Sequence, residues 1–103
     1  MVRYRNYQTV KYGHFAEFLE ISEELNAVIK QRGLTPLVAW VPTVGTANQI
    51  VFESEYPDLT AYQRESEKIY TDAECMKLIR RESELVVQDS VRDELWEAAP
   101  HLA

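Results

Sequence analysis

Hydrophobic and polar positions follow two different periodicities in the first third of the chain. Residues 2–10 alternate in character and are rich in Tyr, Val and Thr, which is typical of a strand. Between residues 14 and 32 the apolar positions recur at helical spacing, and glutamates occupy the opposite side. Gly33 is a suitable stop for this helix. The chain is therefore expected to open with a strand followed by a long helix.

The middle of the chain predicts a hairpin followed by helices. Residues 37–44 and 48–56 have the composition of two strands, and Gly45-Thr46-Ala47 separates them as a turn. Asp58 is a suitable N-cap for the next helix. Thr71-Asp72-Ala73-Glu74 has the spacing of a capping box, so we expect a further helix that ends near Arg81.

Residues 85–97 alternate again and predict one last strand of about 13 residues, more than twice the usual length. Strand, helix, strand, strand, helix and strand, joined by right-handed crossovers, give an α+β, ferredoxin-like βαββαβ fold. Its sheet has four antiparallel strands, and helices cover one face. We expect residues 1–103 to form a single domain, since the chain is too short for a second core.

Apolar residues occupy both faces of the expected sheet. Leu37 and Ala39 point to one side of their strand, while Val38 and Trp40 point to the other. An uncovered sheet face that meets water is normally polar. We therefore expect a homodimer in which two copies pack sheet to sheet and close a barrel, with the long last strand reaching the partner.

Composition and motifs limit the other partners. The net charge of −6 argues against nucleic acid and against an anionic membrane surface. Cys75 is the single cysteine, and no apolar run is long enough to cross a membrane, so we expect a cytoplasmic protein. Patterns for phosphate loops, zinc sites or nucleophilic serines are absent, so no metal or cofactor is expected and no catalytic residue is assigned.

Aromatic residues with a few polar groups are typical of small-molecule sites. On that basis the candidate ligand-binding residues are Arg5, Tyr7, Trp40, Asn48, Tyr62 and Arg92. The expected pocket lies between the sheet and the helices, beside Tyr7 and Tyr62. Glu53 and Glu55 share one face of the third strand, opposite Arg5 and Arg3 of the first strand. They are expected to form cross-strand ion pairs rather than a catalytic dyad.

A series of short motifs resembles the pattern of NIPSNAP-like domains. The motifs are Tyr4-Arg5-Asn6-Tyr7, Lys11-Tyr12-Gly13, Phe15-Ala16-Glu17-Phe18-Leu19, Gly45 with Asn48, Tyr56 with Asp58, Leu59 and Arg64, then Asp72, and finally Leu85-Val86-Val87-Gln88-Asp89-Ser90. The resemblance implies a dimeric α/β barrel. This fold is shared with antibiotic-biosynthesis-type monooxygenases, haem-degrading enzymes and isomerases of aromatic breakdown.

Three functional hypotheses remain open, because one fold hosts many chemistries. The first is a homodimeric small-molecule-binding or accessory protein of the NIPSNAP-like type. The second is a small cofactor-independent monooxygenase or isomerase acting on an aromatic or polyketide-like compound, in which Asn48, Trp40 and Arg92 would surround the pocket by analogy. The third is a purely structural or interaction module.

Overall fold

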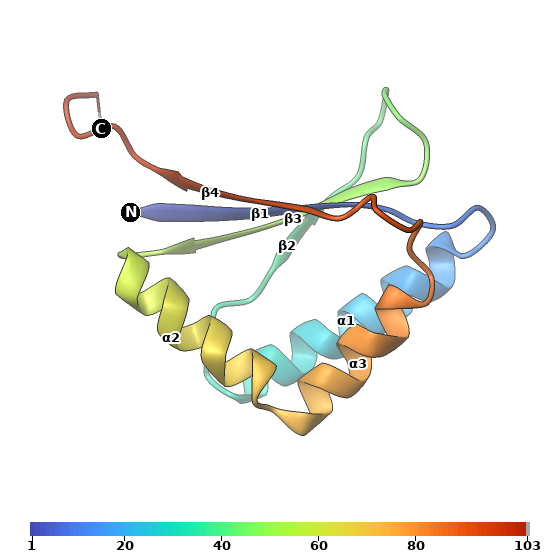
Figure 1. Ribbon diagram of the computed structural model, residues 1–103, viewed down its shortest axis with the longest axis horizontal. Helices are drawn as coiled ribbons and strands as arrows, with labels where there is room; N and C mark the ends of the chain where they lie inside the picture. The colour runs from blue at the N-terminus through green and yellow to red at the C-terminus, as the bar shows by residue number, and fades with distance from the viewer. Residues whose placement is uncertain (103) are drawn as a thin grey trace.

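Residues 1–102, which the computed structural model describes, form a four-stranded sheet with three helices on one face (Figure 1). The elements, in chain order, are β1 (Val2–Thr9), α1 (Phe15–Gln31), β2 (Val38–Trp40), β3 (Gln49–Tyr56), α2 (Leu59–Tyr70), α3 (Ala73–Ser83) and β4 (Arg92–Glu97). The sheet order is β2-β3-β1-β4, and every pair of neighbours is antiparallel. This arrangement confirms the expected ferredoxin-like α+β fold, with two helices in its second crossover.

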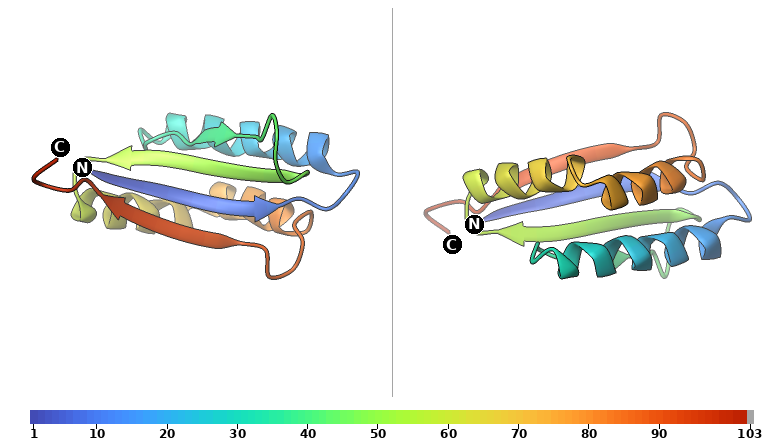
Figure 2. Two further views of the ribbon diagram at one scale, coloured as in Figure 1. Left: turned by 90° about the horizontal axis from the view of Figure 1, so that it is seen from above. Right: turned by 90° about the horizontal axis from the view of Figure 1, so that it is seen from below.

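Alternation along β1 decides which side chains meet the helices. Val2 and Asn6 are buried on the helix side, whereas Arg3 and Arg5 lie on the opposite, open face. Figure 2 shows α1 beneath the β2–β3 half of the sheet, and α2 and α3 beneath the β1–β4 half.

Two clusters of buried side chains hold the layers together. One joins α1 to α3 and comprises Ile21, Leu25, Val28, Ile29, Leu34, Cys75 and Leu78. The other joins the start of α1 to the sheet and comprises Val10, Phe18, Ile50, Phe52 and Val86. Cys75 is fully buried, as expected of a small core residue.

Aspartates cap the two helices of the second crossover. Asp58 is the N-cap that the sequence predicts, whereas the expected capping box does not form, because Asp72 is the N-cap of α3 and Thr71 ends α2. The Asp58 side chain accepts a hydrogen bond from the Ala61 backbone N–H at 2.8 Å. Asp72 accepts from the backbone N–H groups of Glu74 and Cys75, each at 3.0 Å. These bonds satisfy N–H groups that a helix start leaves without partners.

Two of the expected strands are shorter than predicted. In place of residues 37–44, β2 spans only Val38–Trp40, and Pro42 has no N–H group with which to extend the ladder. In place of residues 85–97, β4 begins at Arg92. Asp89 has a φ of 65°, a left-handed conformation that interrupts extended backbone. The prediction of one continuous strand over residues 85–97 is therefore wrong.

Candidate functional site

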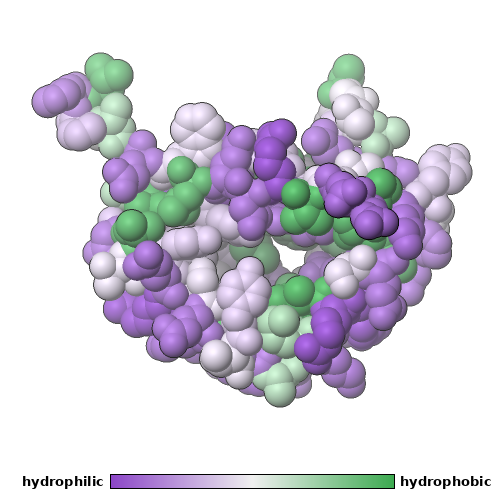
Figure 3. Space-filling view, viewed as in Figure 1, coloured by the Kyte–Doolittle hydropathy of each residue, from purple (hydrophilic) through white to green (hydrophobic). Residues whose placement is uncertain are grey.

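A cavity of about 150 Å³ lies between the sheet and the helices. Figure 3 shows an opening between these two layers. The cavity continues into an outer space of about 320 Å³, bordered by residues 86–89, Val91 and Asp93, which we call the mouth. The inner volume is below the range of about 300–1,000 Å³ that drug-sized ligands use. Its size therefore suits a very small molecule.

Tyrosines form one wall of the cavity. The ring of Tyr62, on α2, lies with its centroid 5.7 Å from that of Tyr4 and 5.4 Å from that of Tyr56, the second pair being edge to face. Tyr70, at the end of α2, also lines the cavity. Burial raises the pKa values of Tyr4, Tyr56 and Tyr70 above the ordinary tyrosine value, so their hydroxyl groups are neutral at physiological pH.

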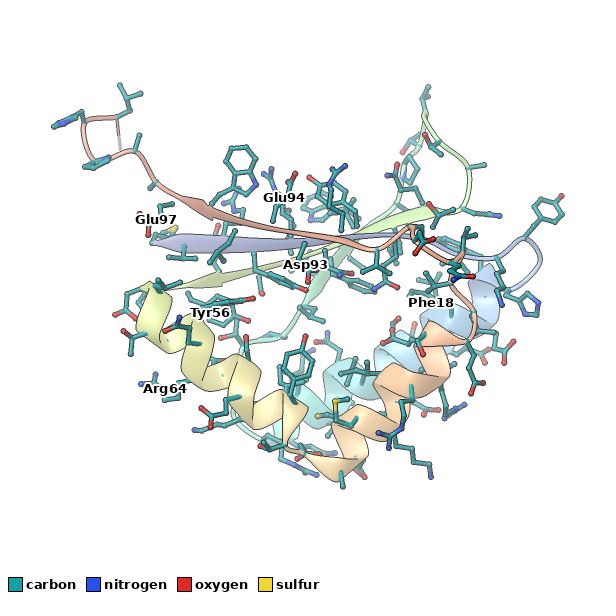
Figure 4. All side chains as sticks on the ribbon, viewed as in Figure 1. Phe18, Tyr56, Arg64, Asp93, Glu94 and Glu97 are labelled. Carbon is teal, nitrogen blue, oxygen red and sulfur yellow. The ribbon has the colours of Figure 1, made fainter. Side chains whose placement is uncertain are left out.

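A series of hydrogen bonds links β1 to β4 beside the cavity. Gln8 Nε2 donates to Asn6 Oδ1 at 2.6 Å, and Asn6 Nδ2 donates to Asp93 Oδ1 at 2.7 Å. The Tyr4 hydroxyl donates to the same Asp93 oxygen at 3.0 Å. Figure 4 shows Asp93 on the helix side of β4 and Glu94 on the other side. These hydrogen bonds therefore hold the side-chain amides of Asn6 and Gln8 in fixed directions at the cavity.

Glu82 of α3 borders both the cavity and the mouth, and only 7% of its surface is exposed. Ser22 Oγ donates to Glu82 Oε2 at 2.5 Å and is also 3.0 Å from the Phe18 carbonyl oxygen. Burial raises the pKa of Glu82, and the Ser22 hydrogen bond opposes part of that effect. A buried carboxyl group thus faces a space large enough for a ligand.

Four of the candidate residues predicted from the sequence lie on the open face of the sheet. Arg5 Nε donates to Glu53 Oε2 at 2.6 Å, and the Arg5 guanidinium lies 5.6 Å from the Trp96 ring centroid. The Arg92 guanidinium lies 4.2 Å from the Tyr7 ring centroid. Trp40 is 57% exposed on the same face.

The other two candidates lie elsewhere. Tyr62 lines the cavity, so the expected pocket is present beside Tyr62 but does not include Tyr7. Asn48 ends the loop after β2 with a φ of 60°, and its carbonyl oxygen accepts a hydrogen bond from the Val10 N–H at 2.8 Å. The structure therefore does not bring the six residues together, and a ligand-binding role for them stays a prediction.

The open face carries the ion pairs that the sequence predicts. Arg3 pairs with Glu55, and Arg5 pairs with Glu53, in the expected antiparallel register. Trp96 lies in the same register row as Arg3 and is 53% exposed. Charged pairs and large exposed aromatic rings therefore share this face.

The strongest cavity residues were not among the sequence candidates. Tyr4, Asn6 and Gln8 alternate with the open-face residues and share the parity of the buried Val2 and Val10. The sequence signal for these three residues is a polar group at a position that faces the core. A buried polar group needs a hydrogen-bond partner, so its presence there indicates more than packing. Glu82 gives the same signal on α3.

No three His, Cys, Asp or Glu side chains within residues 1–102 are grouped closely enough to hold a metal ion. Across the same residues, no helix is both long enough and apolar enough to span a membrane. The carboxylates around the cavity are therefore spread along its border rather than gathered at one point.

Known proteins resemble the chain in sequence pattern and in fold. The profile of the NIPSNAP family matches residues 2–99. An uncharacterised NIPSNAP domain protein from Burkholderia xenovorans is 20% identical, with a TM-score of 0.81 over 100% of this chain and 99% of that one. No curated protein sequence matches the chain significantly.

Two solved enzyme structures share the fold at a similarly low sequence identity. An antibiotic biosynthesis monooxygenase is 20% identical, with a TM-score of 0.77 over 97% of this chain and 100% of that one. A mutant of SnoaB, a cofactor-independent oxygenase from Streptomyces nogalater, is 18% identical, with a TM-score of 0.71 over 98% of this chain and 95% of that one. At these identities the similarity establishes the fold and not the reaction.

Proposed function

This chain belongs to the NIPSNAP family, and we propose that it is a homodimeric protein that binds a small molecule between its sheet and its helices. The observation that carries the proposal is the cavity of about 150 Å³ with an aromatic wall, a buried carboxyl group and oriented amides. Ligand sites combine apolar walls with a few placed polar groups in this way.

The open face of the sheet supports the homodimer. Val38, Trp40 and Trp96 are each more than half exposed there. Figure 1 shows the loop between β2 and β3 and the C-terminal end rising on this side, away from the helices. A second copy packed against the face would cover these apolar side chains and lie between the two projections.

Two further expectations belong to the same proposal. We infer a cytoplasmic location, which the single, fully buried Cys75 supports because it makes no disulfide. We also treat residues 1–103 as one domain, which the NIPSNAP match over residues 2–99 supports.

A cofactor-independent oxygenase is the second candidate function. The fold shared with an antibiotic biosynthesis monooxygenase and with SnoaB favours it. The cavity is comparable in volume to one that binds benzene in another protein, so it suits one ring rather than a fused ring system. This candidate predicts oxygen uptake with a monocyclic phenol, and uptake equal to that of a protein-free control would contradict it.

Native mass spectrometry of freshly purified protein tests the main proposal. We expect a mass of about 24 kDa, twice the 12.0 kDa of one chain, plus a reproducible small adduct. Ser66 lines the cavity, whereas Gln63 is exposed on the same helix. The adduct should be absent from Ser66→Phe, which fills the cavity, and present in the matched control Gln63→Phe. A monomer, or an adduct that survives Ser66→Phe, would contradict the proposal.

A further inference from the structure

Carboxylates border the cavity and its mouth without a balancing cation. Glu82 borders both spaces, and Asp89 and Asp93 border the mouth. Within residues 1–102, no Lys, Arg or His lines either space. The chain as a whole also carries a net charge of −6.

One oxygen of Glu82 is free to receive a ligand. Ser22 donates to Oε2, and within residues 1–102 no donor reaches Oε1. No fully buried side-chain oxygen or nitrogen in the same residues lacks a partner. Glu82 Oε1 therefore borders open space, and the spaces that Glu82 lines are the cavity and the mouth.

The rest of the cavity wall suits an apolar body. Four tyrosine rings line the cavity together with aliphatic side chains from α1, α2 and α3: Tyr4, Tyr56, Tyr62, Tyr70, Leu25, Ile29, Ile69 and Ile79. The face of a tyrosine ring carries a partial negative charge, which favours a nearby cation. The inner volume of about 150 Å³ accommodates roughly one six-membered ring.

We propose that the ligand of this cavity is a small primary amine in its ammonium form, with an apolar body of about one ring. The ammonium group donates a hydrogen bond to Glu82 Oε1, and the body packs among the tyrosines. The inference rests on the proposed function and adds the charge and the size of the ligand.

The charge of the ligand follows from the cost of burying an unpaired carboxylate. A buried charge is stabilised when a partner of opposite charge donates hydrogen bonds to it. Burial raises the pKa of Glu82 because the protein supplies no such partner. An ammonium ligand provides this partner of opposite charge. A neutral ligand leaves the Glu82 carboxylate without one, and an anionic ligand adds charge repulsion.

Three ligands with one ring and different head groups test the inference by isothermal titration calorimetry. Phenethylamine, 2-phenylethanol and phenylacetate are respectively cationic, neutral and anionic at pH 7. We expect phenethylamine to bind at least about tenfold more tightly than 2-phenylethanol, since hydrogen bonds to charged groups are the stronger ones. Phenylacetate should show no measurable binding.

Variants connect the preference to the carboxyl group. Glu82→Gln should weaken phenethylamine binding about tenfold or more and should not weaken 2-phenylethanol binding. Glu67 is exposed on α2 and lines neither space, so Glu67→Gln is the matched control and should leave both affinities unchanged. The comparison of head groups uses the unmodified protein and does not depend on how a variant folds.

The outcomes separate the two proposals. Equal affinity for phenethylamine and 2-phenylethanol, both abolished by Ser66→Phe, would overturn the assignment of charge while supporting a ligand site in the cavity. Failure of all three compounds to bind would overturn the amine proposal. The adduct in native mass spectra would then decide the proposed function independently.

Discussion

Glu82 lies on the face of α3 whose other residues belong to the core. Cys75 and Leu78 lie four to seven residues before it on the same helix face, and both are buried. A carboxyl group at such a position loses its hydration, and here only Ser22 compensates for that loss. Glu82 is therefore expected to lower the stability of the ligand-free protein.

Glu82→Gln should raise the melting temperature of the ligand-free protein at pH 8. The raised pKa means that the folded protein binds this proton more tightly than the unfolded chain. Stability therefore falls as pH rises from the unfolded pKa through the folded pKa, and glutamine removes that loss. A gain of about 1 kcal/mol corresponds to roughly 4–8 °C in a domain of this size. Scanning fluorimetry should show the gain shrinking toward pH 4, and no gain at pH 8 would contradict it.

Single residues also show how far sequence reasoning reaches. The register of β1 and β3 was predictable, because alternation and opposite charges place Arg3 and Arg5 beside Glu55 and Glu53. The role of Asn48 was not, since a left-handed backbone conformation depends on how the loop closes. Aromatic and arginine residues predicted a ligand-binding site. Because successive side chains of a strand point to opposite faces, however, most of these residues lie on the open face and not at the cavity.

At the scale of elements, local signals predicted where helices begin better than where strands end. Asp58 and Asp72 act as caps within one turn of their own helices, so neighbouring residues suffice to recognise them. A strand ends where its partner ends, and that depends on distant residues. β4 begins only at Arg92, although β1 runs to Thr9, because the left-handed backbone at Asp89 interrupts the ladder between the Val10–Val86 bridge and the Tyr7–Arg92 pair.

Asp72 connects the start of α3 to α1. Its carboxyl group caps α3 and accepts from Arg32 Nε at 2.7 Å, and these contacts lower its pKa to about 2. A lowered folded pKa gives stability that is present above the ordinary pKa of 3.8 and is lost as pH falls toward 2.

Asp72→Asn should therefore lower the melting temperature slightly at pH 7, since asparagine keeps a cap oxygen but loses the ion pair. Asp72→Ala should lower it by several degrees, because it also loses the cap. Circular dichroism melts should show the deficit of Asp72→Asn narrowing from pH 7 to pH 3. A deficit that grows over this range would contradict the assignment.

At the scale of the whole molecule, the two faces of the sheet differ in what they contact and expose. The helix face builds the cavity, and the open face presents both tryptophans of the chain, Trp40 and Trp96, on its two outer strands. Tryptophan emission therefore reports on the open face alone. If a second copy covers this face, dilution should move the emission to longer wavelength.

Val51→Lys should disrupt the proposed dimer. Val51 lies on β3 between Trp40 and Tyr7 in the sheet register, at the centre of the open face. An unpaired charge buried there costs about 3 kcal/mol or more, so association should weaken at least about a hundredfold. Light scattering after size exclusion should give the mass of one chain, with red-shifted tryptophan emission. Gln63→Lys adds the same charge on the outside of α2 and should remain dimeric, and a dimeric Val51→Lys would contradict the interface.

The δ1-methyl groups of the isoleucines provide the most direct test of a ligand site between the sheet and the helices. Ile29, Ile69 and Ile79 line the cavity, whereas Ile21 and Ile50 are buried outside it. Methyl NMR spectra recorded during a phenethylamine titration should show saturable shifts for the first three and little change for the other two. Unchanged spectra, or shifts confined to Ile21 and Ile50, would contradict binding of the amine in this cavity.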